Sequence, residues 1–131
     1  MNTAKYRQLT DVHLLQRIWR NELELALQEV NFWEELLGTL SEGLSDRVTE
    51  SDTWKGEISQ LHHFRRLSKR LLDEIRDVDE QVAAGVRADH VLDADTRLNH
   101  QYLRQEMDSF HADFRTFKSE IRQYMVLQPT F

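Results

Sequence analysis

One stretch, residues 12–40, constrains the fold of this chain more than any other. Plotted at about 100° per residue, as in an α-helix, its apolar residues cover almost half of the circumference. They are Leu14, Leu15, Ile18, Trp19, Leu23, Leu25, Ala26, Val30, Phe32, Trp33, Leu36, Leu37 and Leu40. A helix with so wide an apolar face needs other helices to cover it, because leaving that face in water is unfavourable. The stretch therefore predicts a helical bundle.

Two glutamates, Glu22 and Glu29, lie near the middle of this apolar face. A carboxylate in such a position is ion-paired, protonated, metal-bound or in contact with a partner, because an isolated buried charge is costly. Counting through the two connections places residues 62–66 and Lys118 level with Glu29, and residues 69–70 and His111 level with Glu22. Cations are present at each level, so the favoured interpretation is two buried or half-buried ion pairs that fix the helix register.

Two further stretches have helical periodicity, residues 54–84 and 95–127, with apolar residues every three or four positions. Asp52 or Thr53 can cap the first of these helices, and Asp93 or Asp95 can cap the second. Candidate helix stops are Gly38 or Gly43 after the first long stretch, and Gly85 after the second.

We therefore predict an all-α fold, an up-down-up antiparallel bundle of three long helices at about 11–40, 53–84 and 95–127. It forms a single domain over residues 1–131, with frayed ends at 1–10 and 128–131. The first helix is apolar over more of its circumference than two neighbours usually need. Either a short fourth helix within residues 41–51 or dimerisation completes the bundle, or three bulky helices bury the whole face themselves.

Composition limits the classes of function. The chain has a net charge of −6, which disfavours nucleic acid and anionic membranes as partners, because both attract positive surfaces. It contains no cysteine, which excludes disulfides, thiolate metal sites and a cysteine nucleophile. No run approaches the roughly 18 apolar residues of a membrane span, and residues 1–9 lack the apolar core of a signal peptide. The expected location is the cytoplasm.

A carboxylate bundle that binds a metal or a small molecule is the alternative function. Its candidate inner polar groups are Glu22, Glu29, Glu57, Glu106, Asp113 and His111, and its candidate metals are iron, manganese or zinc. The chain has no Glu-x-x-His pair of the kind that di-iron bundles use. Arginines stand four residues after His13, His62, His100 and His111, where a second ligand would be needed. No metal site is therefore assigned.

A basic cluster on the second helix is a candidate surface for an anion or an acidic partner. It consists of His62, His63, Arg65, Arg66, Lys69 and Arg70. However, Asp73 and Glu74 follow Lys69 and Arg70 at ion-pair spacing, which favours a solvated, self-neutralising face.

No arrangement typical of a catalytic site can be placed from this sequence. It has no Ser-His-Asp or Cys-His pattern, and its glycines do not form a phosphate-binding loop. We therefore expect a non-enzymatic bundle that acts by association with itself, most simply as a dimer, and with another protein.

Overall fold

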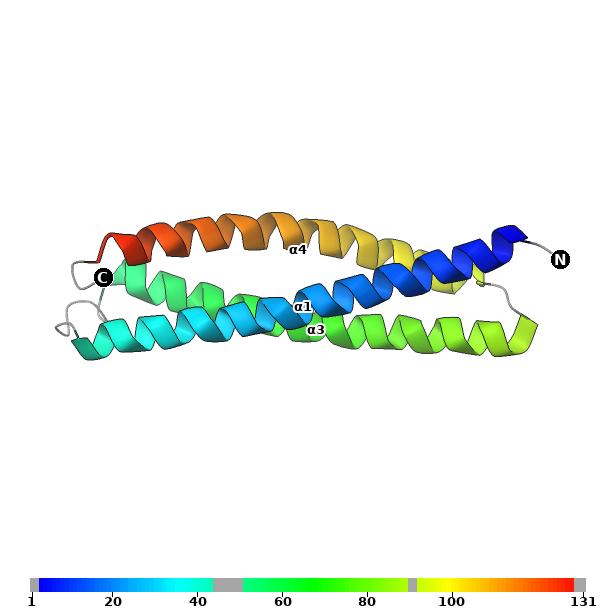
Figure 1. The fold of residues 1–131 in the computed structure, drawn as a ribbon, viewed down its shortest axis with the longest axis horizontal. Coiled ribbons are helices and arrows are strands. Elements are labelled where there is room, and N and C mark those ends of the chain that lie inside the picture. The colour runs from blue at the N-terminus through cyan, green and yellow to red at the C-terminus, as the bar shows by residue number, and fades with distance from the viewer. Residues whose placement is uncertain (1–2, 44–50, 90–91, 129–131) are drawn as a thin grey trace.

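The computed structural model describes residues 3–43, 51–89 and 92–128. These residues form three long helices, α1 (Thr3–Gly43), α3 (Asp52–Asp89) and α4 (Ala94–Val126). Figure 1 shows them running up, down and up, so that α1 and α4 are parallel and α3 is antiparallel to both. The predicted all-α three-helix bundle is confirmed. The predicted short fourth helix falls mostly outside the described residues.

The helices are longer than the sequence pattern predicts. α1 begins at Thr3 instead of near residue 11, because the buried side chains of Leu9 and Val12 continue its core face toward the start of the chain. α3 passes through Gly85 and ends at Asp89, so the prediction that Gly85 ends this helix is wrong. A glycine inside a helix costs only about 1 kcal/mol, which the packing of a long helix readily outweighs. α1 ends at Gly43, one of the two predicted stops.

Side-chain oxygens cap two of the helices. The Asp93 carboxylate accepts a hydrogen bond from the Thr96 amide at 2.7 Å and caps α4. Of the two predicted caps, Asp93 and Asp95, the first is therefore confirmed. This bond holds the pKa of Asp93 below its usual value. At the start of α3 the Ser51 hydroxyl accepts from the Trp54 amide at 3.1 Å, so the cap lies one residue before the predicted Asp52.

The core contains an aromatic cluster where α3 meets α4. Phe64 of α3 lies with its ring centroid 5.2 Å from that of Phe114 and 5.0 Å from that of Phe117. α1 adds Leu23 and Val30, which have no exposed surface. These side chains come from all three helices, so a single core joins them.

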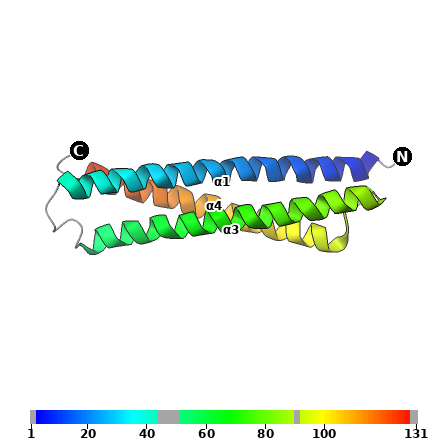
Figure 2. The same cartoon turned by 90° about the horizontal axis from the view of Figure 1, so that it is seen from below.

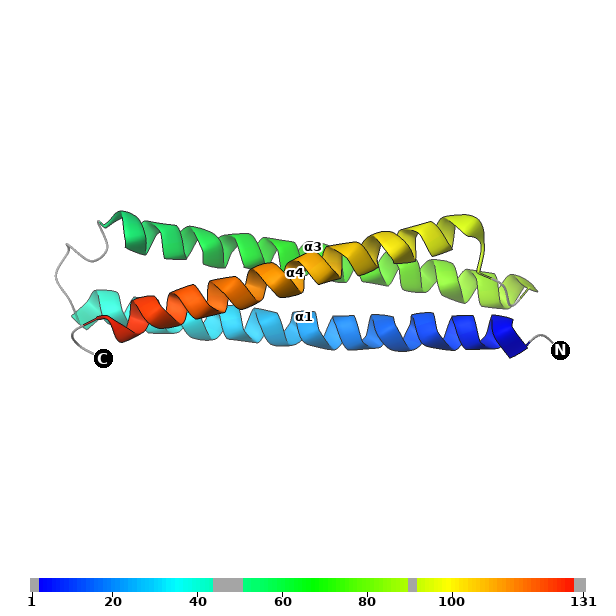
Figure 3. The ribbon, with the colours of Figure 1, turned by 90° about the horizontal axis from the view of Figure 1, so that it is seen from above.

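α3 packs closely against both neighbours, whereas the backbones of α1 and α4 approach each other less closely. Figures 2 and 3 show that α4 crosses the other two helices at an angle. Long polar side chains and open space can therefore occupy the boundary between α1 and α4. None of the described helices has a stretch apolar and long enough to cross a membrane.

Candidate functional site: the outward face of α1

The apolar face of α1 is divided into two parts. One part, which includes Trp19, Leu23, Ala26, Val30 and Leu37, is buried in the core. The other part is exposed to solvent, and we call it the α1 stripe: Leu14 (55% exposed), Ile18 (44%), Leu25 (48%) and Phe32 (53%). The expectation that three bulky helices bury the whole face is therefore wrong for these four residues.

Helix geometry explains the division. Leu23 and Leu25 are two residues apart, so their side chains point about 200° away from each other. Only one of them can face the core, and it is Leu23, with no exposed surface. Ile18, Leu25 and Phe32 recur every seven residues, and Leu14 precedes Ile18 by four, so the α1 stripe follows one line along the helix.

Glu22 and Glu29 lie on the border between the two parts of this face. Their side chains are 36% and 42% exposed, and each contacts a basic side chain of α4. The Glu22 carboxylate contacts His111 Nε2, and the Glu29 carboxylate lies 3.3 Å from Lys118 Nζ. Because α1 and α4 are parallel, the same seven-residue step on both helices repeats the contact. Both contacts lie in the predicted register: Glu29 forms an ion pair with Lys118, and the contact of Glu22 with His111 is an ion pair when the imidazole is protonated.

The other candidate polar groups are not brought together with Glu22 and Glu29. Glu57 is buried on α3, and its Oε2 has no hydrogen-bond partner among the described residues. Burial, and secondarily the nearby Glu120 carboxylate, raise the pKa of Glu57. Glu106 lies 3.6 Å from Arg70, and Asp113 is exposed. Within the described parts of the chain, no three histidine, aspartate or glutamate side chains gather as a metal site would require.

The predicted basic cluster on α3 is divided, because one of its members turns toward α1. Arg65 is half-buried and turns toward α1, where it pairs with the Glu34 carboxylate and donates to Asn31 Oδ1 at 3.0 Å. Its hydrogen bond to Glu34 holds the pKa of that carboxyl below its usual value. Five members of the cluster remain exposed: His62, His63, Arg66, Lys69 and Arg70.

The self-neutralising pattern expected in this cluster forms only in part. Arg70 lies 3.7 Å from Glu74, as its spacing predicts. Lys69 forms no ion pair with Asp73 in the described structure, and Asp73 instead lies 3.7 Å from Arg76. Of the two ion pairs expected within α3, only Arg70–Glu74 therefore forms among the described residues, and the exposed part of the cluster lacks Arg65.

Sequence reasoning missed a pocket at the boundary of α1 and α4, near the start of both helices. It has a volume of about 490 Å³, and its walls include Leu15 of α1 and His100 and Arg104 of α4. His100 is half-buried, stacks on Trp19 at 5.2 Å between ring centroids, and lies 3.5 Å from the buried amide of Gln16. Burial, and then the charge of Arg104, lower the pKa of His100. The one sequence signal was Gln16, a polar residue among apolar ones on the core side of α1.

Comparisons of this chain with protein-family models, with curated proteins and with solved structures find no match.

Proposed function

We propose that this protein is a non-enzymatic association module, in which two copies pair by burying their α1 stripes against each other. The single observation that carries this proposal is the α1 stripe itself, four large apolar side chains each about half exposed along one line of a helix. Single exposed apolar residues are ordinary on protein surfaces, but a continuous row of them is typical of an interaction surface.

The spacing of the α1 stripe is that of a helix–helix seam. A seven-residue repeat with a further apolar residue four positions earlier matches the a and d positions of coiled-coil packing. Leu14 and Phe32 are 18 residues apart, so the stripe extends over about 27 Å of helix. A straight second helix can cover a row of that length.

The charges around the α1 stripe favour a second copy of the same chain. Asn21 and Gln28 occupy the intervening positions of the seam, so between Leu14 and Phe32 it contains no charged residue that pairing would desolvate. Glu22 and Glu29 border the stripe, but each contacts a basic side chain of α4, Glu22 the His111 imidazole and Glu29 the Lys118 ammonium group. The like-charge repulsion expected between two chains of net charge −6 is therefore weakened along this border.

Light scattering coupled to size-exclusion chromatography tests the proposal. We expect wild-type protein to have twice the 15.7 kDa mass of the chain. The double variant Leu25→Gln, Phe32→Gln should have the monomer mass while keeping its helical circular dichroism. The matched control is Leu98→Gln on α4, a residue that is 63% exposed but lies outside the stripe, and it should remain dimeric.

A folded double variant that stays dimeric would contradict the proposed surface. A wild-type protein that is monomeric at every concentration tested would contradict self-association itself and point to another protein as the partner of the stripe.

A further inference from the structure

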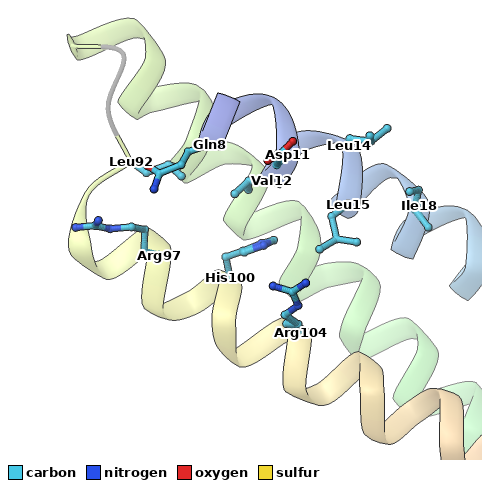
Figure 4. A pocket seen from close by; sticks show the side chains of 10 residues that line it. All are labelled: Gln8, Asp11, Val12, Leu14, Leu15, Ile18, Leu92, Arg97, His100 and Arg104. Carbon is cyan, nitrogen blue, oxygen red and sulfur yellow. The ribbon is translucent and has the colours of Figure 1, made fainter. Parts of the chain in front are cut away.

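The pocket between α1 and α4 has the size and shape of a small-molecule site. Its volume of about 490 Å³ lies within the range of about 300–1,000 Å³ that is typical of ligand pockets. It lies between the N-terminal parts of α1 and α4, which supply all but one of its lining residues. Figure 4 shows Leu15 pointing from α1 toward α4, and His100 and Arg104 pointing from α4 toward α1.

The two sides of this pocket differ in chemistry. The α1 side is mainly apolar, with Val12 and Leu15 among its residues, although Gln8 and Asp11 also line it. Leu92, which precedes α4, adds to the apolar lining. The α4 side is basic: Arg97, His100 and Arg104 all line it. An apolar wall opposite a row of cations fits a molecule that has an apolar body and an anionic end.

The charge of the pocket is locally positive in an acidic chain. Two arginines, Arg97 and Arg104, line it together with a single carboxylate, that of Asp11. None of these three side chains forms an ion pair in the part of the chain that the structure describes, although Arg104 stands four residues before Asp108. The Arg104 guanidinium is thus available to a ligand, and its planar fork suits a carboxylate.

The stacking of His100 fixes the position of a second donor. The ring lies on Trp19, and the buried Gln16 amide nitrogen contacts its Nδ1 at 3.5 Å. With Nδ1 accepting from Gln16, the proton of a neutral imidazole is on Nε2, which can donate to an anion. His100 and Arg104 are four residues apart on one side of α4, so both can reach the same carboxylate.

We propose that this pocket binds an apolar monocarboxylate of fatty-acid type. Its carboxylate is held by Arg104 and His100, and its hydrocarbon chain lies against Val12, Leu15 and Leu92. This proposal does not rest on the proposed dimer, although Leu14 and Ile18 belong both to the α1 stripe and to the lining of the pocket.

Calorimetric titration of the full chain with octanoate tests the site, with 1-octanol as a ligand of the same chain length that lacks the charge. We expect octanoate to bind at one site per chain with a dissociation constant on the order of 10⁻⁴ M. Octanol should bind at least about tenfold more weakly, because it cannot pair with Arg104.

Variants separate the pocket from other surfaces. Arg104→Gln should weaken octanoate binding about tenfold. The matched control Arg115→Gln removes an exposed arginine of the same helix outside the pocket, and it should leave the affinity unchanged. The Leu25→Gln, Phe32→Gln variant should also bind octanoate normally, whether or not it dimerises.

Three results would overturn the proposal: octanol binding as tightly as octanoate, equal effects of the two arginine variants, or loss of binding in the stripe variant. The last result would place the hydrocarbon chain on the α1 stripe. Because the mass of the stripe variant is measured independently, failure of this site and failure of the dimer remain distinguishable.

Discussion

Replacing Glu57 with glutamine should stabilise this protein at neutral pH. Glu57 is 9% exposed, and its Oε2 is buried without a hydrogen-bond partner among the described residues. The nearest titratable groups on the facing helix are Glu120 and Tyr124 of α4, and neither supplies a positive charge. Among the described residues, no cation or hydrogen-bond donor compensates for the desolvation of Oε2. Leaving a buried polar group unsatisfied costs about 1–3 kcal/mol, and we expect the substitution to recover about 1 kcal/mol of that cost.

The effect should depend on pH in a defined direction. Burial and Glu120 raise the pKa of Glu57 from its ordinary value of 4.5. The folded state therefore holds this proton more tightly than the unfolded state does, and the contribution of Glu57 to stability falls as pH rises from 4.5 through the raised pKa. Below that window the protonated glutamic acid resembles glutamine, so the two proteins should have nearly equal stability.

Urea unfolding of wild type and Glu57→Gln at a series of pH values, at one fixed protein concentration, measures this difference. Glu35→Gln, which alters an exposed glutamate of α1, is the control and should show no such trend. The reasoning would be refuted if Glu57→Gln were less stable than wild type at pH 7, or if their difference did not change with pH.

Three further predictions follow from the packing. The side chains of Glu29 and Lys118 are 42% and 33% exposed, so solvent screens their attraction. A double-mutant cycle on this pair, measured by urea unfolding, should give a coupling free energy of only about 0.2–1 kcal/mol. A larger value would mean that the pair is more deeply buried. Leu23→Ala should lower the unfolding free energy by about 2–5 kcal/mol, because this side chain is fully buried. Leu25→Ala should lower the unfolding free energy by less than about 1 kcal/mol at protein concentrations too low for association. Equal effects of Leu23→Ala and Leu25→Ala would contradict the division of the apolar face. Ser68→Ala should raise the free energy of unfolding by about 0.5–1 kcal/mol, because it removes a buried hydroxyl that has no hydrogen-bond partner among the described residues. A destabilised variant would show that this hydroxyl is bonded.

The sequence predicted those features that depend on periodicity and register. The regular spacing of apolar residues predicted three long helices in an up-down-up arrangement, and counting through the connections placed His111 near Glu22 and Lys118 near Glu29. Register could be predicted because parallel and antiparallel helices advance by the same rise per residue. The cap at Asp93 followed from the chemistry of a short carboxylate before a helix.

Features that depend on how the helices cross could not be predicted. The arc of apolar residues on α1 was wide enough to include both Leu23 and Leu25, and periodicity alone does not say where the neighbouring helices lie around that arc. The pocket beside His100 lies between α1 and α4, and the periodicity of each helix by itself does not give the spacing between the two. Whether Arg65 joins a basic surface or turns to Glu34 likewise depends on the distance between α1 and α3.

Cross-linking at Leu25 tests the central claim, that two copies bury their α1 stripes together, most directly. Leu25 lies near the middle of the stripe, so parallel and antiparallel pairing both bring it close to its counterpart. The chain contains no cysteine, so Leu25→Cys introduces a single reactive thiol, and Leu98→Cys on α4 is the control. With a short bifunctional maleimide at low protein concentration, the account predicts a covalent dimer for Leu25→Cys and none for Leu98→Cys. Equal cross-linking of the two variants, or none at Leu25→Cys in a folded protein, would contradict it.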